Sequence, residues 1–278
     1  MSVIAFYTNC KDQTGNTMSA IAFATYLGIV QNQKTLFIST SINDNTIRQA
    51  FWGTPPKKRS GLFGPNTNVI SENGIEGLDR VIRSNKIAPD IITDYTKVAL
   101  KNRLEILMGY RGSEEQYRSI QKQYLQIANM ASKCYDNVII DIDKQLDMKT
   151  RFELTNAADV VVAMTTQKLE NINDLITTMN DGVALKRQNS IITLGKYDEN
   201  SKYNSRNISR NILKQKDIVN TIPYNTILFE AVQEGQIIDM FIKFLGIKGK
   251  DENTFFIEEI ERLKKSVEEK IREQQLMK

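Results

Sequence analysis

The chain has 278 residues, of which 41% are hydrophobic, and its 37 basic and 33 acidic residues give a formal net charge of +4. This length and apolar content are enough for one large α/β domain or two small ones, and so small a charge excess does not by itself indicate a nucleic-acid partner. The absence of histidine excludes Ser-His and Cys-His nucleophile pairs, and two cysteines are too few for a disulfide framework or a zinc site. Because no apolar run reaches the ~18 residues of a membrane span and no secretory signal opens the chain, we expect a cytoplasmic protein without an integral membrane segment.

The first part of the chain alternates short apolar runs with helical patterns. Residues 3–8 are apolar, β-branched and aromatic, which predicts a strand, and residues 17–30 have helical periodicity. Residues 35–40 predict a second strand, whereas residues 41–71 are irregular and contain several prolines and glycines. Beyond them we expect helices over 77–98 and 116–134, with a strand over 103–108.

The same alternation continues toward the C-terminus. We expect strands over 137–142, 160–165, 190–194 and 218–222, with helical stretches between them. Strands that are apolar on both faces and separated by helices predict a mostly parallel, twisted sheet with helices on both faces. Since no repeat or linker interrupts this part, we predict one α/β domain over residues 1–250.

Residues 251–278 have a different character. They predict a charged amphipathic helix whose apolar residues recur every three or four positions: Phe256, Ile260, Leu263, Val267 and Ile271. Two interpretations stay open, a helix that docks on the domain and a helix that binds a partner or a second copy. Membrane attachment is disfavoured because Glu and Lys are interleaved on the polar face.

The loop that follows the first strand occupies the place of a phosphate-binding loop. In such loops, glycines allow close approach of the backbone, the N–H groups of a helix N-terminus bind phosphates, and a lysine neutralises their charge. Against the pattern G-x-x-x-x-G-K-[ST], Gly15 and Thr17 match, while Cys10 replaces the first glycine and Asn16 replaces the lysine.

The loop and three later segments, in this order, resemble the motifs of one protein family. After the loop come YDNVIID at 135–141, ADVVV at 158–162 and TIPY at 221–224, which is followed by FEA at 229–231 and Gly235. Together they resemble the ParA/MinD family of P-loop ATPases, whose deviant Walker A loop reads K-G-G-x-G-K-[ST]. The resemblance extends from Met1 to about Leu245 and implies the P-loop fold.

The resemblance also implies ligands and partners. Members of the family bind ATP with Mg²⁺, pair as homodimers, and position plasmids, chromosomes or other cargo in bacterial cells. Lys11 aligns with the family's extra lysine, which reaches the nucleotide of the partner subunit. Carried over to this chain, the nucleotide-binding positions are Lys11, Thr14, Gly15, Asn16 and Thr17, and the magnesium positions are Thr17 and Asp141. Lys11 as a solvated loop residue and Asp141 as a turn cap are the alternatives.

Four departures from the family predict a degenerate site. Asn16 carries no charge for a phosphate, and Asp12 and Gln13 replace two glycines, so that Asp12 repels a nucleotide unless the loop turns its side chain away. Ser39 and Ser41 stand where the family has the two acids of D-x-D. Leu194-Gly195-Lys196 stands where the family often has L-N-R. We therefore assign no catalytic residue and expect negligible hydrolysis.

A basic stripe offers a separate hypothesis. It consists of Lys202, Arg206, Arg210 and Lys214, which are spaced by four residues and therefore share one helical face. Contact with DNA phosphates and simple solvation are both open interpretations. A shorter basic cluster lies at residues 57–59.

These observations favour a ParA/MinD-like positioning or partition-type protein with a degenerate ATP site, a pseudo-ATPase. We expect it to bind nucleotide weakly or not at all, and to act through dimerisation and recruitment of a protein partner or cargo complex. One alternative is an active partition ATPase that uses Lys11. The other is a DNA-binding or scaffold protein that needs no nucleotide.

Overall fold

The computed structural model describes residues 1–54, 74–84, 88–211, 219–249 and 251–277. Its strands form one sheet in the order β3-β4-β2-β5-β1-β6-β7-β8. The strands are β1 (Ser2–Tyr7), β2 (Thr35–Ser39), β3 (Lys97–Leu100), β4 (Leu104–Leu107), β5 (Asn137–Asp141), β6 (Val160–Thr165), β7 (Ser190–Tyr197) and β8 (Asn220–Pro223). All neighbouring strands are parallel except the pair β3 and β4, so the predicted fold class, a mostly parallel sheet with helices on both faces, is confirmed.

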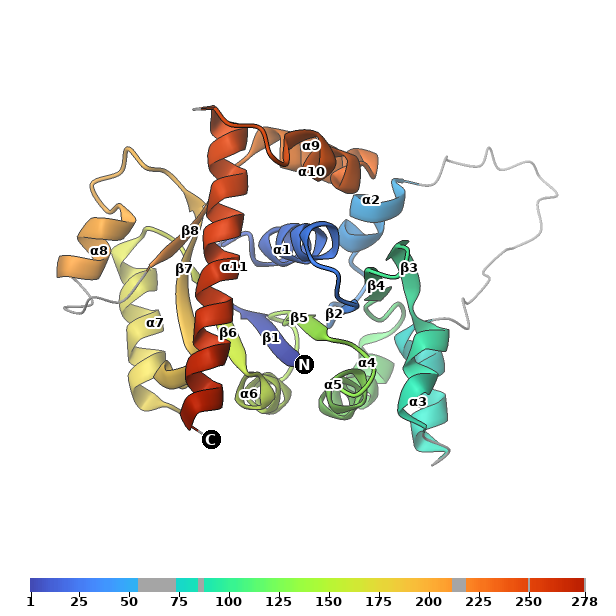
Figure 1. The fold of residues 1–278 in the computed structure, drawn as a ribbon. Helices are drawn as coiled ribbons and strands as arrows, with labels where there is room; N and C mark the ends of the chain where they lie inside the picture. Colours follow the sequence, from blue (N-terminus) through green and yellow to red (C-terminus); the bar gives the residue numbers. More distant parts are fainter. Residues whose placement is uncertain (55–73, 85–87, 212–218, 250, 278) are drawn as a thin grey trace, which may run out of the picture.

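Helices cover both faces of this sheet (Figure 1). The helices of the described residues are α1 (Asn16–Val30), α2 (Thr46–Trp52), α3 (Ile75–Arg83), α4 (Glu114–Ile120), α5 (Tyr124–Ala131), α6 (Met148–Ala157), α7 (Leu169–Asp181), α8 (Ser205–Asn211), α9 (Thr226–Glu234), α10 (Ile237–Phe244) and α11 (Glu252–Met277). Along β1, Ile4 and Phe6 join the core beneath α1, α10 and α11, while Ala5 and Tyr7 join the core beneath α5 and α6. Alternate residues of a strand point to opposite faces, which is why the two cores are interleaved in sequence.

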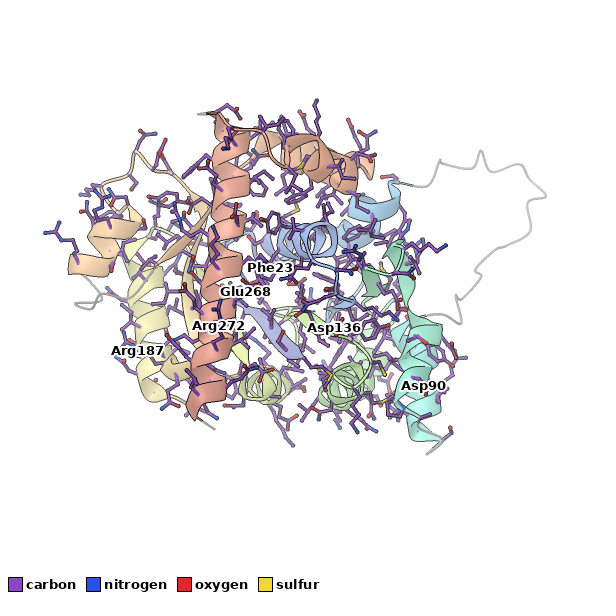
Figure 2. The ribbon with its side chains drawn as sticks, in the orientation of Figure 1. Phe23, Asp90, Asp136, Arg187, Glu268 and Arg272 are labelled. Atoms are coloured by element: carbon purple, nitrogen blue, oxygen red, sulfur yellow. The ribbon has the colours of Figure 1, made fainter. Side chains whose placement is uncertain are left out.

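The C-terminal helix α11 packs on the domain. Phe256, Ile260 and Leu263 have no exposed surface, and Val267 is 2% exposed. Their neighbours lie on β8, α1 and α10. Glu268, labelled in Figure 2, accepts a hydrogen bond from Gln31 at the end of α1. The apolar stripe read from the sequence is thus covered by the chain's own core.

The segment 77–98, for which we expected helices alone, contains a strand as well. It contains α3, a 3₁₀ helix (Pro89–Tyr95) and the edge strand β3, which pairs antiparallel with β4. Asn102 in the connecting turn has a φ of 60°, a conformation that asparagine tolerates well. Because Lys97 and Val98 are exposed at the sheet edge, the strand lacks the apolar pattern that marks the inner strands.

No helix among the described residues is both long enough and apolar enough to cross a bilayer.

Candidate functional site

The loop between β1 and α1 places a helix N-terminus at the carboxyl edge of the sheet. Gly15 takes the N-cap position of α1 with φ 77° and ψ 21°, a left-handed conformation that favours glycine. No side chain caps this helix, and its first turn carries no acidic residue. In parallel sheets, ligands bind outside the carboxyl ends of the strands where the strand order reverses, and β1 lies between β5 and β6 at such a point. The helix start is therefore suited to an anion.

A cavity of about 690 Å³ opens at this helix start. Residues 13–19 form its floor, and further walls come from Asp44 and Thr46, from residues 142–145, from Lys196, and from residues 222–225 with Leu228 and Phe229. Its volume lies within the ~300–1,000 Å³ range of small-molecule sites. Tyr224 and Phe229 at the cavity wall are 58% and 48% exposed, so two aromatic rings are free to contact a ligand.

Asn16 is turned toward the end of β5. Its Nδ2 atom donates to Asp141 Oδ1 at 2.8 Å and to the Phe6 carbonyl at 3.4 Å. Its Oδ1 atom and the hydroxyl of Thr14 are buried with no hydrogen-bond partner among the described residues. The residue at the lysine position therefore bonds to the protein itself and brings no positive charge to the cavity.

Asp141 is a carboxyl group with almost no access to water, since it is 1% exposed. Burial raises its pKa to about 7, and the nearby carboxylates of Asp143 and Asp44 act in the same direction. Hydrogen bonds from Thr17 and Asn16 partly oppose this rise in pKa. The structure thus brings Thr17 and Asp141 together, as their expected role in magnesium binding requires, but the Asp141 carboxyl is already bonded to Asn16.

The fit to magnesium is poorer than the fit to a phosphate chain. Magnesium is usually held through one or two carboxylates together with substrate phosphates and water. Of the carboxylates near the cavity, Asp44 accepts hydrogen bonds from Thr46 N and Oγ1, Asp143 accepts one from Gln145 N, and Asp141 accepts one from Asn16. In the described part of the chain, no group of three or more acidic or cysteine side chains is placed to hold a metal ion.

Asp12 does not face the cavity. Its Oδ2 atom lies 2.8 Å from Lys168 Nζ and accepts a hydrogen bond of 2.8 Å from Asn171 at the start of α7. The hydrogen bond from Lys168 holds the pKa of this carboxyl below its usual value. The loop has therefore turned the carboxylate away, and the repulsion expected from the sequence is relieved.

Lys11 and Lys144 relate to this loop in different ways. Lys11 is exposed and does not line the cavity. Lys144 Nζ donates to the carbonyl of Asp12 at 2.7 Å and reaches that of Lys11 at 3.5 Å. Lys144 thus ties the loop to the segment that follows β5.

Ser39 and Ser41 bond to each other. Their hydroxyl oxygens are 2.8 Å apart, and the two residues are 0% and 4% exposed. Neither lines the cavity. The positions of the family's two acids thus hold a neutral, closed pair that presents no charge to a ligand.

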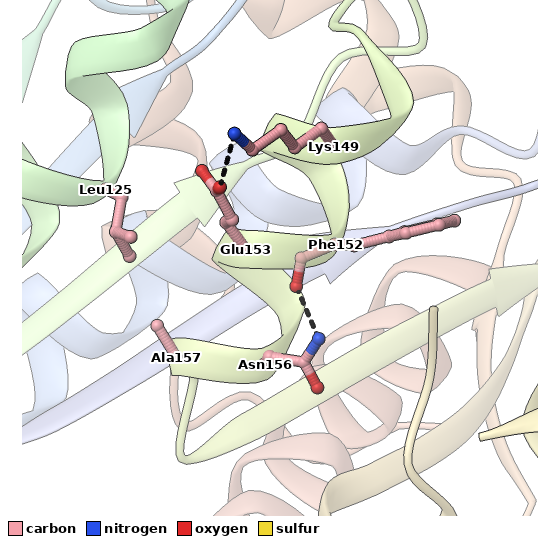
Figure 3. Close-up of a pocket in the computed structure, with 6 residues that line it drawn as sticks. All are labelled: Leu125, Lys149, Phe152, Glu153, Asn156 and Ala157. Carbon is pink, nitrogen blue, oxygen red and sulfur yellow. Dashed lines mark hydrogen bonds and ion pairs between the residues drawn. The ribbon is translucent and has the colours of Figure 1, made fainter. Parts of the chain in front are cut away.

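The remaining candidates lie elsewhere. Lys202 precedes α8, and Arg206 and Arg210 lie on it, all with exposed side chains, while Lys214 and the cluster at 57–59 fall outside the described residues. A shallow hollow between α5 and α6 is shown in Figure 3. Its polar side chains already have partners, since Lys149 pairs with Glu153 at 3.8 Å and Asn156 donates to the carbonyls of Phe152 at 2.8 Å and of Val183 at 3.5 Å. These side chains therefore do not converge on a ligand.

Sequence reasoning missed three contributors to the cavity, namely Asp44, Lys196 and the ring of Phe229. Asp44 comes five residues after β2 in the irregular segment, and only its position near the end of a strand signals it. Lys196 was visible as part of Leu194-Gly195-Lys196, but its direction depends on the backbone at the end of β7.

Comparison with known proteins defines the fold. A scan against protein-family models finds no match, and no curated protein sequence matches the chain. Among solved structures, MinD from Pyrococcus horikoshii complexed with Mg-ADP superposes with a TM-score of 0.63, at 13% identity over 97% of this chain and 98% of that one. A protein described as a plasmid partition protein from Borrelia burgdorferi B31, bound to AMPPNP, gives a TM-score of 0.59 at 20% identity, covering 99% of this chain and 98% of that one.

The fold is that of the ParA/MinD ATPases. A ParA family ATPase from Chlorobium tepidum also matches, with a TM-score of 0.60 at 16% identity over 85% of this chain and 91% of that one. The resemblance predicted from the sequence segments is confirmed at this level. Because all these identities are below 25%, the ParA/MinD likeness fixes the architecture, and activity must be argued from the cavity itself.

Proposed function

We propose that this chain is a ParA/MinD-type positioning or partition protein that does not hydrolyse nucleotide at a significant rate. It binds nucleotide weakly or not at all, and it acts by pairing with a second copy and recruiting a protein partner. The observation that carries the proposal is the hydrogen bond from Asn16 to Asp141. Asn16 stands at the position where a lysine would face the phosphates, and its side chain is turned to Asp141 instead. Similar structures that are partition proteins and a MinC:MinD complex support the positioning role.

Three charged groups are missing at once from the hydrolytic site. Asn16 replaces a lysine, and Ser39 and Ser41 replace two acids. Removing one preorganised charge-stabilising group typically lowers the rate by about 100- to 1,000-fold. Because a serine hydroxyl is a poor general base at neutral pH, Ser39 and Ser41 do not take over the role of the two acids.

The test is a phosphate-release assay with purified protein, ATP and magnesium. We expect no release above a buffer control, together with little or no thermal shift on addition of ATP, ADP or GTP. The variant Asn16→Lys serves as a matched control, because it restores one charge and leaves the serine pair in place. Turnover comparable with that of ordinary partition ATPases would overturn the proposal. If Lys11→Ala then abolished that turnover, the chain would be an ATPase that uses Lys11.

A further inference from the structure

Two lysines line the cavity in the described part of the chain, and they are in different situations. Lys144 already donates to the loop carbonyl of Asp12 at 2.7 Å. Lys196 Nζ contacts Gln13 Oε1 at 3.5 Å, the outer limit of a hydrogen bond, and makes no ion pair with any described carboxylate. Of the two cations, Lys196 is therefore the one available to a ligand.

The backbone holds Lys196 at this position in a rare conformation. Its φ is 49°, a region that residues other than glycine seldom adopt and that concentrates at ligand-binding sites. The pairing of β7 with β8 shifts register between Gly195 and Tyr197, so the strand bends at Lys196. The bend accompanies a close approach, since a Cβ atom on Gly195 would lie 2.0 Å from the carbonyl oxygen of Thr14.

This contact places Lys196 beside the start of α1. Its Cγ atom lies 3.8 Å from where a Cβ atom on Gly15 would be. Next to it, the Thr14 hydroxyl is unpartnered although Thr14 is only 2% exposed. Lys196, a Thr14 hydroxyl with no partner among the described residues, and the uncapped N-terminus of α1 thus lie close to one another in the cavity lining, which also includes Asp44 and Asp143. The combination of an ammonium group, a hydroxyl and a helix N-terminus has the chemistry of a phosphate site.

We propose that Lys196 supplies, from β7, the positive charge that binds the phosphate chain of a nucleotide at the start of α1, where Asn16 supplies none. The inference rests on the proposed function: of its two cases, weak nucleotide binding and none, it takes weak binding and names the residue that gives the cavity its affinity. It makes Lys196 a binding residue in the subunit's own site, in contrast to the cross-subunit contact implied for Lys11.

The test is isothermal titration with inorganic tripolyphosphate, ADP and adenosine as probes, with and without magnesium. Lys196→Gln is expected to weaken the binding of tripolyphosphate and of ADP by about 10- to 100-fold, the usual effect of losing a hydrogen bond to a charged group. Adenosine binding should not change, Lys196→Arg should recover most of the affinity, and the control Lys186→Gln, before the other end of β7, should match the wild type. Glycine adopts a positive φ without strain, so the melting temperature of Lys196→Gly should not fall below that of the wild type. Its affinity for the phosphate probes should nevertheless fall.

Two results would overturn the inference: equal affinity of Lys196→Gln and the wild type, or no binding of either phosphate probe by the wild type. Equal affinities of Lys196→Arg and Lys196→Gln would also overturn it, because charge would then not matter. The proposed function fails on a different readout, ATP turnover of the wild type on the same samples. A protein that hydrolysed ATP yet lost ADP affinity in Lys196→Gln would retain the inference and lose the proposed function.

Discussion

At the scale of single residues, Asp141 makes stability depend on pH. Its pKa is about 7 in the folded chain against 3.8 ordinarily, so between these values the folded state holds a proton that the unfolded state has released. The stability contributed by the neutral form is therefore lost as pH rises from about 4 to about 7, and the loss is complete above pH 7. The difference in pKa corresponds to a change on the order of 4 kcal/mol in the free energy of unfolding.

Asp141→Asn should remove this dependence, since an amide stays neutral and can still accept the bond from Asn16. We expect the variant to resemble the wild type near pH 4 and to exceed its unfolding free energy by a few kcal/mol at pH 8. Urea unfolding across this range, in EDTA, measures the difference. Asp12→Asn is the control, because Asp12 is a loop carboxylate paired with Lys168 and its pKa is lowered. Parallel curves for the wild type and Asp141→Asn would contradict the prediction.

At the scale of elements, α11 is part of the core. Leu263 has no exposed surface and lies within the cluster that also contains Phe23 and Phe256. Leu263→Ala should lower the free energy of unfolding by about 2–5 kcal/mol, through lost burial and the cavity left behind. Chemical denaturation measures it, with Leu276→Ala as the control, because Leu276 is 89% exposed on the same helix. Similar stabilities of the two variants would show that α11 is not docked in solution.

The helix α8 allows the DNA hypothesis to be tested. Arg206 and Arg210 are exposed one turn apart, so both can contact a phosphate backbone. If they do, affinity for duplex DNA should fall steeply with salt, because binding releases counterions. Arg206→Glu with Arg210→Glu should abolish binding in a low-salt gel shift, while Lys101→Glu with Lys133→Glu, which changes the net charge equally, should weaken it much less. A wild type that does not bind at low salt would end the hypothesis.

The sequence carried more information on the elements than on the cavity. Inner strands such as β5 and β6 are buried on both faces, so their continuous apolar runs predicted them, whereas β3 is an exposed edge strand and was missed. The direction of Asp12 depends on Lys168, 156 positions later, and that of Lys196 depends on the approach of Gly195 to Thr14. Such contacts between distant segments are tertiary and leave no local pattern.

At the scale of the whole molecule, the prediction is a homodimer with the two Lys11-bearing loops facing each other across a two-fold axis. Lys11 is exposed at the loop surface, where a second subunit can reach it. In a background with Cys10 and Cys134 changed to Ser, Lys11→Cys should form a covalent dimer with a short bismaleimide. Leu276→Cys, at the far end of α11, is the control for pairing through the C-terminal helices.

Light scattering with and without ATP gives the mass of the uncrosslinked protein. A monomer under all conditions, or crosslinking at position 276 without crosslinking at position 11, would rule out this arrangement.

The tight packing of Ser39 and Ser41 has a consequence for any redesign of these positions. A Cβ atom on Gly109 would lie 2.5 Å from the Ser41 carbonyl oxygen and 2.7 Å from its hydroxyl, so β4 and its following turn have closed against the two serines. Larger acidic side chains at positions 39 and 41 would need this packing to reopen, and two carboxylates so close together would resist ionising together. Placing acids at positions 39 and 41 would therefore require compensating changes around Gly109 as well, so a double substitution alone should fold less stably than the wild type.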